Sequence, residues 1–225
     1  MRLLVVKIVI FFISILDKLI SKNNNYVVYN SFPDISDNSF ALFLYILDNY
    51  PEKKNIWLVK HLTSKKCESL INEYSINGNY ILVKRDSFKG IFYYLRAKYV
   101  FFTHGLFAGA KISKQHCVIN LWHGMPLKKI GLLEKNEISQ KSKYAIATSG
   151  FYQNIMAEAF GMKNEDVLIV GQPRNDLMFK KKDYLSNFGI NRCNSMKIVL
   201  WTPTFRQSIR GDIRLDGLFS ENLAG

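Results

Sequence analysis

The chain's 225 residues are enough for one large domain or two small ones. Hydrophobic residues make up 48% of the chain and aromatic residues 14%, which excludes a disordered protein and predicts a packed core. Lysine and arginine outnumber the acidic residues by 31 to 18, and the net charge of +13 predicts an anionic partner: a nucleic acid, an anionic membrane face or a phosphate-bearing substrate.

The N-terminal segment, residues 1–25, is apolar and flanked by basic residues. Its core, "LLVVKIVIFFISIL", is shorter than the roughly 20 residues that a membrane-spanning helix needs, and no small-residue cleavage site follows it. Two interpretations stay open: a helix lying in the interface of an anionic membrane, with its lysines reaching the headgroups, or a core helix of the first domain. The basic flanks favour the membrane interpretation.

Between residue 26 and residue 180, short apolar runs alternate with amphipathic ones. The apolar runs predict strands at residues 26–32, 55–60, 80–84, 99–103, 118–122, 144–148 and 167–171. The segments between them predict helices at residues 39–50, 65–74 and 91–97, in the basic stretch after residue 122, and at residues 151–160. Strands that are apolar on both faces and separated by helices indicate a doubly wound parallel sheet. Residues 26–180 are therefore predicted to form one Rossmann-like α/β lobe.

Two of these helices carry boundary signals. Asp37 or Asn38 is positioned to cap the helix at residues 39–50. Ser149 is expected to cap the helix at residues 151–160, and Gly161 to end it.

The rest of the chain predicts a second, incomplete domain. Residues 181–195 form a basic, less apolar linker, and "MKIVLWTPTFR", from residue 196, predicts the first strand of another Rossmann-like lobe. A domain usually needs about 50 residues or more. Residues 196–225 are therefore expected to be only the start of a second lobe.

Polar residues gather where three of the predicted strands end, and ligands of open parallel sheets bind outside the carboxyl ends of strands. The three segments are residues 122–124, 173–176 and 202–206. In the first, His123 is suited to remove a proton from a hydroxyl, and Gly124 lets a substrate approach the backbone closely. The alternative for His123 is a loop histidine whose hydrogen bonds are satisfied by the protein.

The sequence after His123 also predicts an anion site. Pro126 suits the first turn of a helix, whose free N–H groups attract phosphate, and Lys128 and Lys129 add positive charge nearby. The alternative is a pair of solvated lysines. Together with His123, this segment predicts a base beside a phosphate.

The motifs "LWHGMPLKKIG", "VGQPRNDLMF" and "WTPTFR", in this order, resemble the CDP-glycerol glycerophosphotransferase family of bacterial teichoic acid and capsule synthesis. "SFPDISDNSFALFLYIL" is similar to that family's opening strand, loop and helix. The resemblance implies a two-lobed fold of the GT-B type, peripheral to the cytoplasmic face of the plasma membrane. It also implies transfer of polyol phosphate from CDP-glycerol or another CDP-polyol to a lipid-linked or polyol-phosphate acceptor, with release of CMP.

By motif match, His123 is implied as the general base that deprotonates the acceptor hydroxyl. Arg174 and Arg206 are implied as phosphate contacts, since guanidinium groups pair well with phosphate oxygens, and Asp37 and Asn38 as residues lining the acceptor side. Two alternatives stay open, a helix cap for Asp37 and Asn38 and a mutual ion pair for Arg174 and Asp176. The full set of substrate contacts expected is Asp37, Asn38, Gly124, Lys128, Arg174, Asp176, Thr204 and Arg206.

The chain departs from the family pattern in its second lobe. That lobe supplies most of the family's nucleotide and pyrophosphate site, including a further histidine and a Ser-Asp stretch, yet no histidine follows His123 here. Met125 replaces a small hydroxyl residue of many relatives. We therefore expect a chain truncated within its second lobe, with impaired or absent transferase activity by itself.

Two other functions fit the same lobe: that of a different GT-B enzyme, which transfers a sugar from a nucleotide donor, and that of a non-catalytic membrane-associated module that binds the acceptor. Nucleic-acid binding rests on charge alone, because no recognition motif is present. No metal site is expected, since Cys67, Cys117 and Cys193 form no C-x-x-C pair and the histidine spacings fit no zinc pattern. A magnesium ion on the donor pyrophosphate stays open.

Overall fold

The structure is a computed structural model that describes residues 2–62, 72, 74, 76, 78–134, 141–179, 185, 189–190 and 196–201. The chain divides into two compact units, Met1–Lys181 and Lys182–Gly225. Every helix and strand that the structure describes belongs to the first unit.

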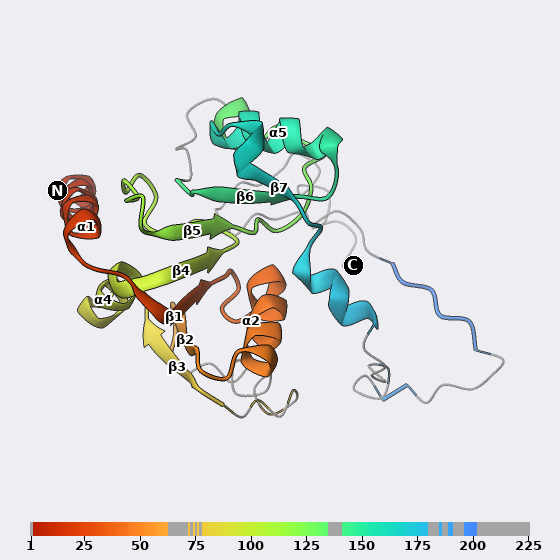
Figure 1. Ribbon diagram of the computed structural model, residues 1–225. Helices are drawn as coiled ribbons and strands as arrows, with labels where there is room; N and C mark the ends of the chain where they lie inside the picture. The colour runs from red at the N-terminus through yellow and green to blue at the C-terminus, as the bar shows by residue number, and fades with distance from the viewer. Residues whose placement is uncertain are drawn as a thin grey trace, which may run out of the picture. The chain divides into compact units, whose positions relative to one another are not determined.

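Seven strands of the first unit form one sheet in the order β3-β2-β1-β4-β5-β6-β7, and all neighbouring pairs are parallel (Figure 1). The chain winds outward from β1 to β3, returns to place β4 beside β1, and then winds outward in the other direction. This confirms the predicted doubly wound sheet, whose order reverses between β1 and β4. The strands are β1 (Asn23–Asn30), β2 (Lys54–Val59), β3 (Tyr80–Lys84), β4 (Ala97–Phe102), β5 (Cys117–Asn120), β6 (Tyr144–Ala147) and β7 (Val167–Ile169).

The described helices of this unit are α1 (Arg2–Leu19), α2 (Asp37–Asn49), α4 (Phe88–Arg96) and α5 (Gly150–Phe160), with the short 3-10 helices η1 (Gly131–Leu133), η2 (Asn164–Asp166) and η3 (Pro173–Phe179). Of these, α2, α4 and α5 lie between strands and confirm the helices predicted at residues 39–50, 91–97 and 151–160. The Ser149 hydroxyl accepts the N–H of Tyr152, and Gly161 ends α5 in the left-handed conformation, which confirms both boundaries. The helix predicted at residues 65–74 lies almost wholly outside the described residues.

The prediction of a helix after residue 122 is wrong for the described part of this stretch. Residues 125–130 form no helix, and among residues 131–134 only the three residues of η1 are helical, whereas residues 135–140 lie outside the described residues. Gly124 and Gly131 bracket this stretch with φ angles of +150° and +53°, outside the helical range. The anion site proposed at a helix N-terminus beside Pro126 therefore does not form.

Both faces of the sheet are covered, which explains the unbroken apolar runs. On β1, Val28 packs into the core beneath α1 and α4, whereas Val27 and Tyr29 face the core beneath α2. On β2, Ile56 packs into the core beneath α1 and α4, and Trp57 packs into the core beneath α2. The period of two along each strand sends alternate side chains into two hydrophobic cores.

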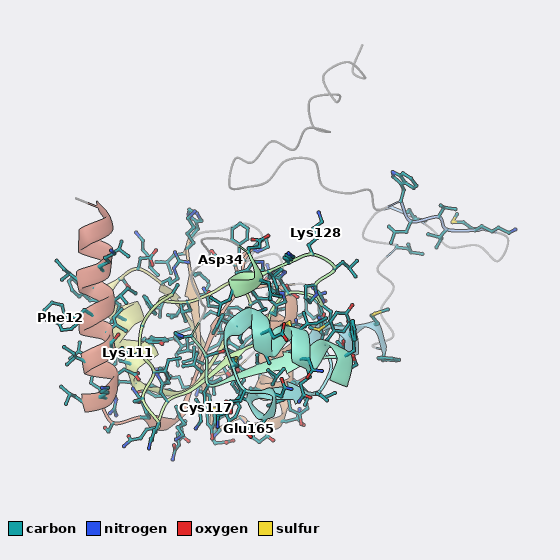
Figure 2. All side chains as sticks on the ribbon, turned by 90° about the horizontal axis from the view of Figure 1, so that it is seen from above. Phe12, Asp34, Lys111, Cys117, Lys128 and Glu165 are labelled. Atoms are coloured by element: carbon teal, nitrogen blue, oxygen red, sulfur yellow. The ribbon has the colours of Figure 1, made fainter. Side chains whose placement is uncertain are left out.

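Helix α1 packs on the first unit as the core-helix interpretation expects, and its binding to a membrane stays a prediction. Ile13 is buried in the core, as a core helix requires, and Asp17 is buried beside it. Phe11 and Phe12 are more than half exposed on the outer side, where Figure 2 shows Phe12 projecting away from the sheet. Within the described residues, none of the helices is both long and apolar enough to cross a membrane.

In the second unit, residues 196–201 are described and lie exposed without forming a strand. A strand requires a neighbour that takes its backbone hydrogen bonds, and none of the described residues pairs with this segment. The strand expected to begin at residue 196 is thus absent from residues 196–201. The division into an acceptor lobe, a linker and a donor lobe stays a prediction.

Candidate functional site

The candidate site lies where β1, β4 and β5 end side by side, next to the point where the strand order reverses. Asn30 aligns with Phe102, and Phe102 with Asn120. Beyond these residues the three chains stay joined, because Thr103 N–H donates to Asn30 O at 3.3 Å and Leu121 N–H donates to Phe102 O at 2.8 Å. The loops that follow the three strands therefore emerge together at the carboxyl edge of the sheet.

Asn38, in the first turn of α2, ties three segments of this edge together. Its side chain is fully buried. The Asn38 Nδ2 group donates to the carbonyl oxygens of Leu121 at 3.1 Å and Trp122 at 3.0 Å, and its Oδ1 accepts the Arg174 N–H at 3.2 Å. Since protein groups occupy both N–H groups and the oxygen, Asn38 positions the loop after β5 and the start of η3. Asn38 therefore has a structural role in this unit, and its expected contact with a substrate stays a prediction.

Asp37 binds Arg174, which lies 137 positions later in the chain. Arg174 Nη1 donates to Asp37 Oδ1 at 2.8 Å, and the same oxygen accepts the Asn38 N–H at 2.8 Å. The alternative pairing of Arg174 with Asp176 is wrong: Asp176 is exposed and forms no ion pair with any described residue. Ser36 occupies the N-cap position of α2, so the cap expected at Asp37 or Asn38 is wrong as well.

Gly124 lies against the guanidinium group of Arg174. Its φ of +150° is a conformation that residues with a side chain rarely adopt. A Cβ atom added there would lie 3.5 Å from Arg174 Nη2. The glycine thus brings the backbone beside His123 close to a fixed positive charge.

The His123 ring is held between two other rings. Its centroid lies 4.1 Å from that of Trp122 and 4.2 Å from that of His104, with interplanar angles of 28° and 17°. Two near-parallel rings at this distance would clash on one face of an imidazole, so Trp122 and His104 stack on opposite faces. Trp122 in turn packs edge-on against Phe160 of α5, at 5.0 Å. We refer to the stack of Trp122, His123 and His104 as the ring sandwich.

The environment keeps His123 in its neutral form. Partial burial lowers the pKa of His123 below its ordinary value near 6.5, an effect that Asp37 opposes and Arg174 reinforces. A neutral imidazole is the form that accepts a proton. At physiological pH the ring therefore carries a free lone pair at an edge of the sheet where ligands commonly bind.

Lys128, another predicted contact, does not join this cluster. It is exposed, and Figure 2 shows its side chain extending away from the main body of the unit. Thr204 and Arg206 lie outside the described residues, so the substrate contacts expected of them stay predictions. No three His, Cys, Asp or Glu side chains in the described ranges come together in a way that suits a metal ion.

Sequence reasoning missed His104 as a site residue, although a signal was present. The segments "FFTHG" and "NLWHG" both end in His-Gly, and they follow adjacent strands that align in register. Strand neighbours are not visible from sequence alone, but two such endings on consecutive apolar runs predict two histidines at one edge.

Known proteins resemble this chain over most of its length. The family model for CDP-glycerol:poly(glycerophosphate) glycerophosphotransferase matches residues 10–223. The teichoic acid glycerol-phosphate transferase of Staphylococcus aureus (strain NCTC 8325 / PS 47) is 27% identical over 214 residues, which cover 84% of this chain and 53% of the relative. The teichoic acid poly(glycerol phosphate) polymerase of Bacillus subtilis (strain 168) is 26% identical over 202 residues, which cover 80% of this chain and 26% of the relative. The chain thus spans between a quarter and about half of the length of these curated relatives.

Solved structures agree on the fold. The wall teichoic acid polymerase TagF superposes with a TM-score of 0.58 at 21% identity, covering 75% of this chain and 43% of that chain. A TagF variant soaked with CDPG superposes with a TM-score of 0.64 at 22% identity, covering 89% of this chain and 53% of that chain. The parallel sheet described above therefore matches about half of a TagF structure.

Proposed function

The chain belongs to the CDP-glycerol:poly(glycerophosphate) glycerophosphotransferase family, and from this premise we propose that it forms the acceptor-side lobe of a polyol-phosphate transferase of teichoic acid or capsular polysaccharide synthesis. The donor is CDP-glycerol or a related CDP-polyol, and the acceptor is a lipid-linked or polyol-phosphate chain. The names of the curated relatives and the CDPG soak of a TagF variant support this donor.

The observation that carries the proposal is the position of the stacked His123 ring at the carboxyl edge of the sheet, next to Gly124, which lies against the Arg174 guanidinium group. In the proposed reaction, His123 takes the proton of an acceptor hydroxyl as the oxygen attacks the β-phosphorus of the donor. The bond from that phosphorus to the bridging oxygen breaks, and CMP leaves with the electron pair. Positioning and fixed charges carry most of the rate enhancement in such transfers.

Arg174 is the proposed phosphate contact nearest to His123. Asp37 binds one end of the Arg174 guanidinium group, and the Arg174 side chain remains 40% exposed. The remaining N–H groups suit the oxygens of a phosphate, which guanidinium forks bind well. Contacts from Lys128, Asp176, Thr204 and Arg206 are proposed on the motif match alone.

We further propose that the lobe sits at the cytoplasmic face of the plasma membrane through α1. The exposed apolar side chains of this helix, such as Phe11 and Phe12, and the exposed Lys7 and Lys18 support binding in an anionic interface. The same surface supports a polyanionic acceptor nearby.

Because the matched relatives are longer than this chain, we propose that much of the donor site comes from a part that this chain does not span. Transfer by the chain alone is then slow, and the test must detect single turnovers. Purified protein in excess over labelled CDP-glycerol, with a glycerol-phosphate oligomer as acceptor, should release CMP slowly.

The His123→Ala variant should reduce this release by about 10²- to 10⁴-fold, the usual contribution of a general base. The exposed His61→Ala variant is the matched control and should keep the wild-type rate. Release of UDP from a UDP-sugar with no CMP from CDP-glycerol would instead favour a nucleotide-sugar transferase. Acceptor binding without release from either donor would favour a non-catalytic module.

A further inference from the structure

We propose that His104 is a positioning residue for His123, forming one wall of the ring sandwich that holds the His123 ring in a single plane. This inference rests on the proposed function, because it assigns a second histidine to the same site. Nothing in the family match or in the motif at residues 120–131 points to His104; its place at the end of β4 does.

His104 is itself fixed from two sides. Its Nδ1 atom lies 2.8 Å from Thr103 Oγ1, and Thr103 is fully buried at the end of β4. The Phe32 ring contacts it edge-on, with centroids 5.7 Å apart. Thus the wall that His104 offers to His123 is anchored to the loops after β4 and β1.

The opposite wall, Trp122, is anchored to a third place, α5, through Phe160. An imidazole attached through the rotatable Cα–Cβ and Cβ–Cγ bonds would otherwise sample several rotamers. Between two anchored rings, rotation about the Cβ–Cγ bond is blocked, because it would swing the imidazole out of the plane of the stack. A base held in this way presents its lone pair in one direction, as a near-attack geometry requires.

The charged groups that face His123 from the neighbouring elements are Asp37 of α2 and Arg174 of η3. His104 faces it from the end of β4 as a stacked ring, with the two ring centroids 4.2 Å apart.

The chain has only four histidines, His61, His104, His116 and His123, so the ring signals can be resolved and assigned by NMR. In the wild type, we expect the His123 ring signal to be shifted upfield by the currents of the two neighbouring rings. The His104→Ala variant should move this signal downfield, whereas His104→Phe should leave it upfield because a ring still covers that face. The Thr103→Val variant, which removes the hydroxyl that orients His104, should give an intermediate shift.

Kinetics gives the second readout. His104→Ala should lower kcat for CMP release by roughly ten- to 10²-fold, the cost of a misdirected catalytic group, with KM for CDP-glycerol unchanged. His104→Phe should restore most of kcat, and His61→Ala should match the wild type.

The outcomes separate the two proposals. An unchanged His123 signal in His104→Ala would overturn the positioning role, whatever its effect on CMP release. The expected NMR shifts together with full activity of His123→Ala would leave the ring sandwich standing and overturn the proposed function instead.

Discussion

Strand β5 has a histidine near each end, and the two differ in nearly every physical respect. His116 precedes the strand, is fully buried and lies 2.6 Å from Asp17 Oδ1 through its Nδ1 atom. His123 follows the strand, is half-buried and is stacked between two rings. The same side chain is thus a fixed structural group at the amino end of the sheet and the proposed base at the carboxyl end.

The amino end is held by a buried polar cluster around Asp17 of α1. Asp17 Oδ1 accepts from Lys22 Nζ at 2.8 Å, and its Oδ2 accepts the Ser113 N–H at 2.6 Å. Burial would raise the pKa of Asp17, but the hydrogen bonds from His116, Lys22 and Ser113 outweigh it and hold that pKa well below its usual range. The ionised carboxylate therefore fastens α1 to the sheet.

His116 has no freedom to act as a base in this cluster. Burial lowers the pKa of His116 despite the attraction of Asp17, so the ring is neutral and donates Nδ1–H to the carboxylate. Its Nε2 atom is buried and has no hydrogen-bond partner among the described residues. The comparison teaches that position relative to the carboxyl edge, and access to it, decides which histidine can do chemistry.

The largest loss of stability should come from disrupting the polar cluster around Asp17 at the amino end of the sheet. In Asp17→Asn the Lys22 charge, whose side chain is 3% exposed, loses its counter-ion. Removing one partner of a buried pair costs about 3–5 kcal/mol, and the free energy of unfolding in urea should fall by that amount. Asp48→Asn, an exposed position on α2, is the matched control and should change it little. Equal losses in the two variants would show that the cluster does not fasten α1.

A smaller loss of stability is expected from the Asn38→Ala variant at the carboxyl end of the sheet. This change leaves the carbonyls of Leu121 and Trp122 and the N–H of Arg174 without their partner. Unsatisfied buried groups cost about 1–3 kcal/mol, and CMP release should fall as well because the loop that carries His123 loses its anchor. An Asn38→Ala variant with weakened stability but wild-type release would contradict the positioning role of Asn38.

The two histidines predict how stability depends on pH. Both pKa values are lowered in the folded chain, so the unfolded chain binds more protons below about pH 6.5 and stability falls as the pH falls. We expect the free energy of unfolding to decrease from pH 7.5 to pH 5.5, with a shallower slope in His116→Gln. Stability that rises toward pH 5.5 would mean that the Asp17 charge, not burial, controls His116. The contribution of ionised Asp17 is lost only below about pH 3.8.

The smallest stability effect should be that of Arg174→Lys. The Asp37–Arg174 pair is partly exposed, and such pairs contribute at most about 1 kcal/mol. The change should nevertheless raise KM for CDP-glycerol, because an ammonium group cannot hold Asp37 and a phosphate with the same fork. A variant with wild-type KM would remove Arg174 from the phosphate site.

The sequence predicts the fold better than it predicts the site. Apolar runs such as residues 55–60 and 144–148 locate the strands because a sheet covered on both faces needs them. The basic stretch after His123 looked helical because its composition suits a helix, but Gly124 and Gly131 adopt φ angles that exclude one.

The remaining site features depend on contacts between distant residues. Arg174 pairs with Asp37, 137 positions away, and not with its near neighbour Asp176. Asn38 was expected to face a substrate, yet the loop after β5 folds over it and takes its hydrogen bonds. Such pairings follow from the strand order and the path of the loops, and the spacing of neighbouring residues in the sequence predicts neither.

The most direct test of His123 as the base is chemical rescue of His123→Ala by imidazole in solution. Single-turnover CMP release from CDP-glycerol would be measured with and without added imidazole, in this variant and in the wild type. The account predicts a rate that is nearly lost in the variant, that rises with the concentration of neutral imidazole, and that does not change in the wild type. Wild-type CMP release by His123→Ala without imidazole would contradict it.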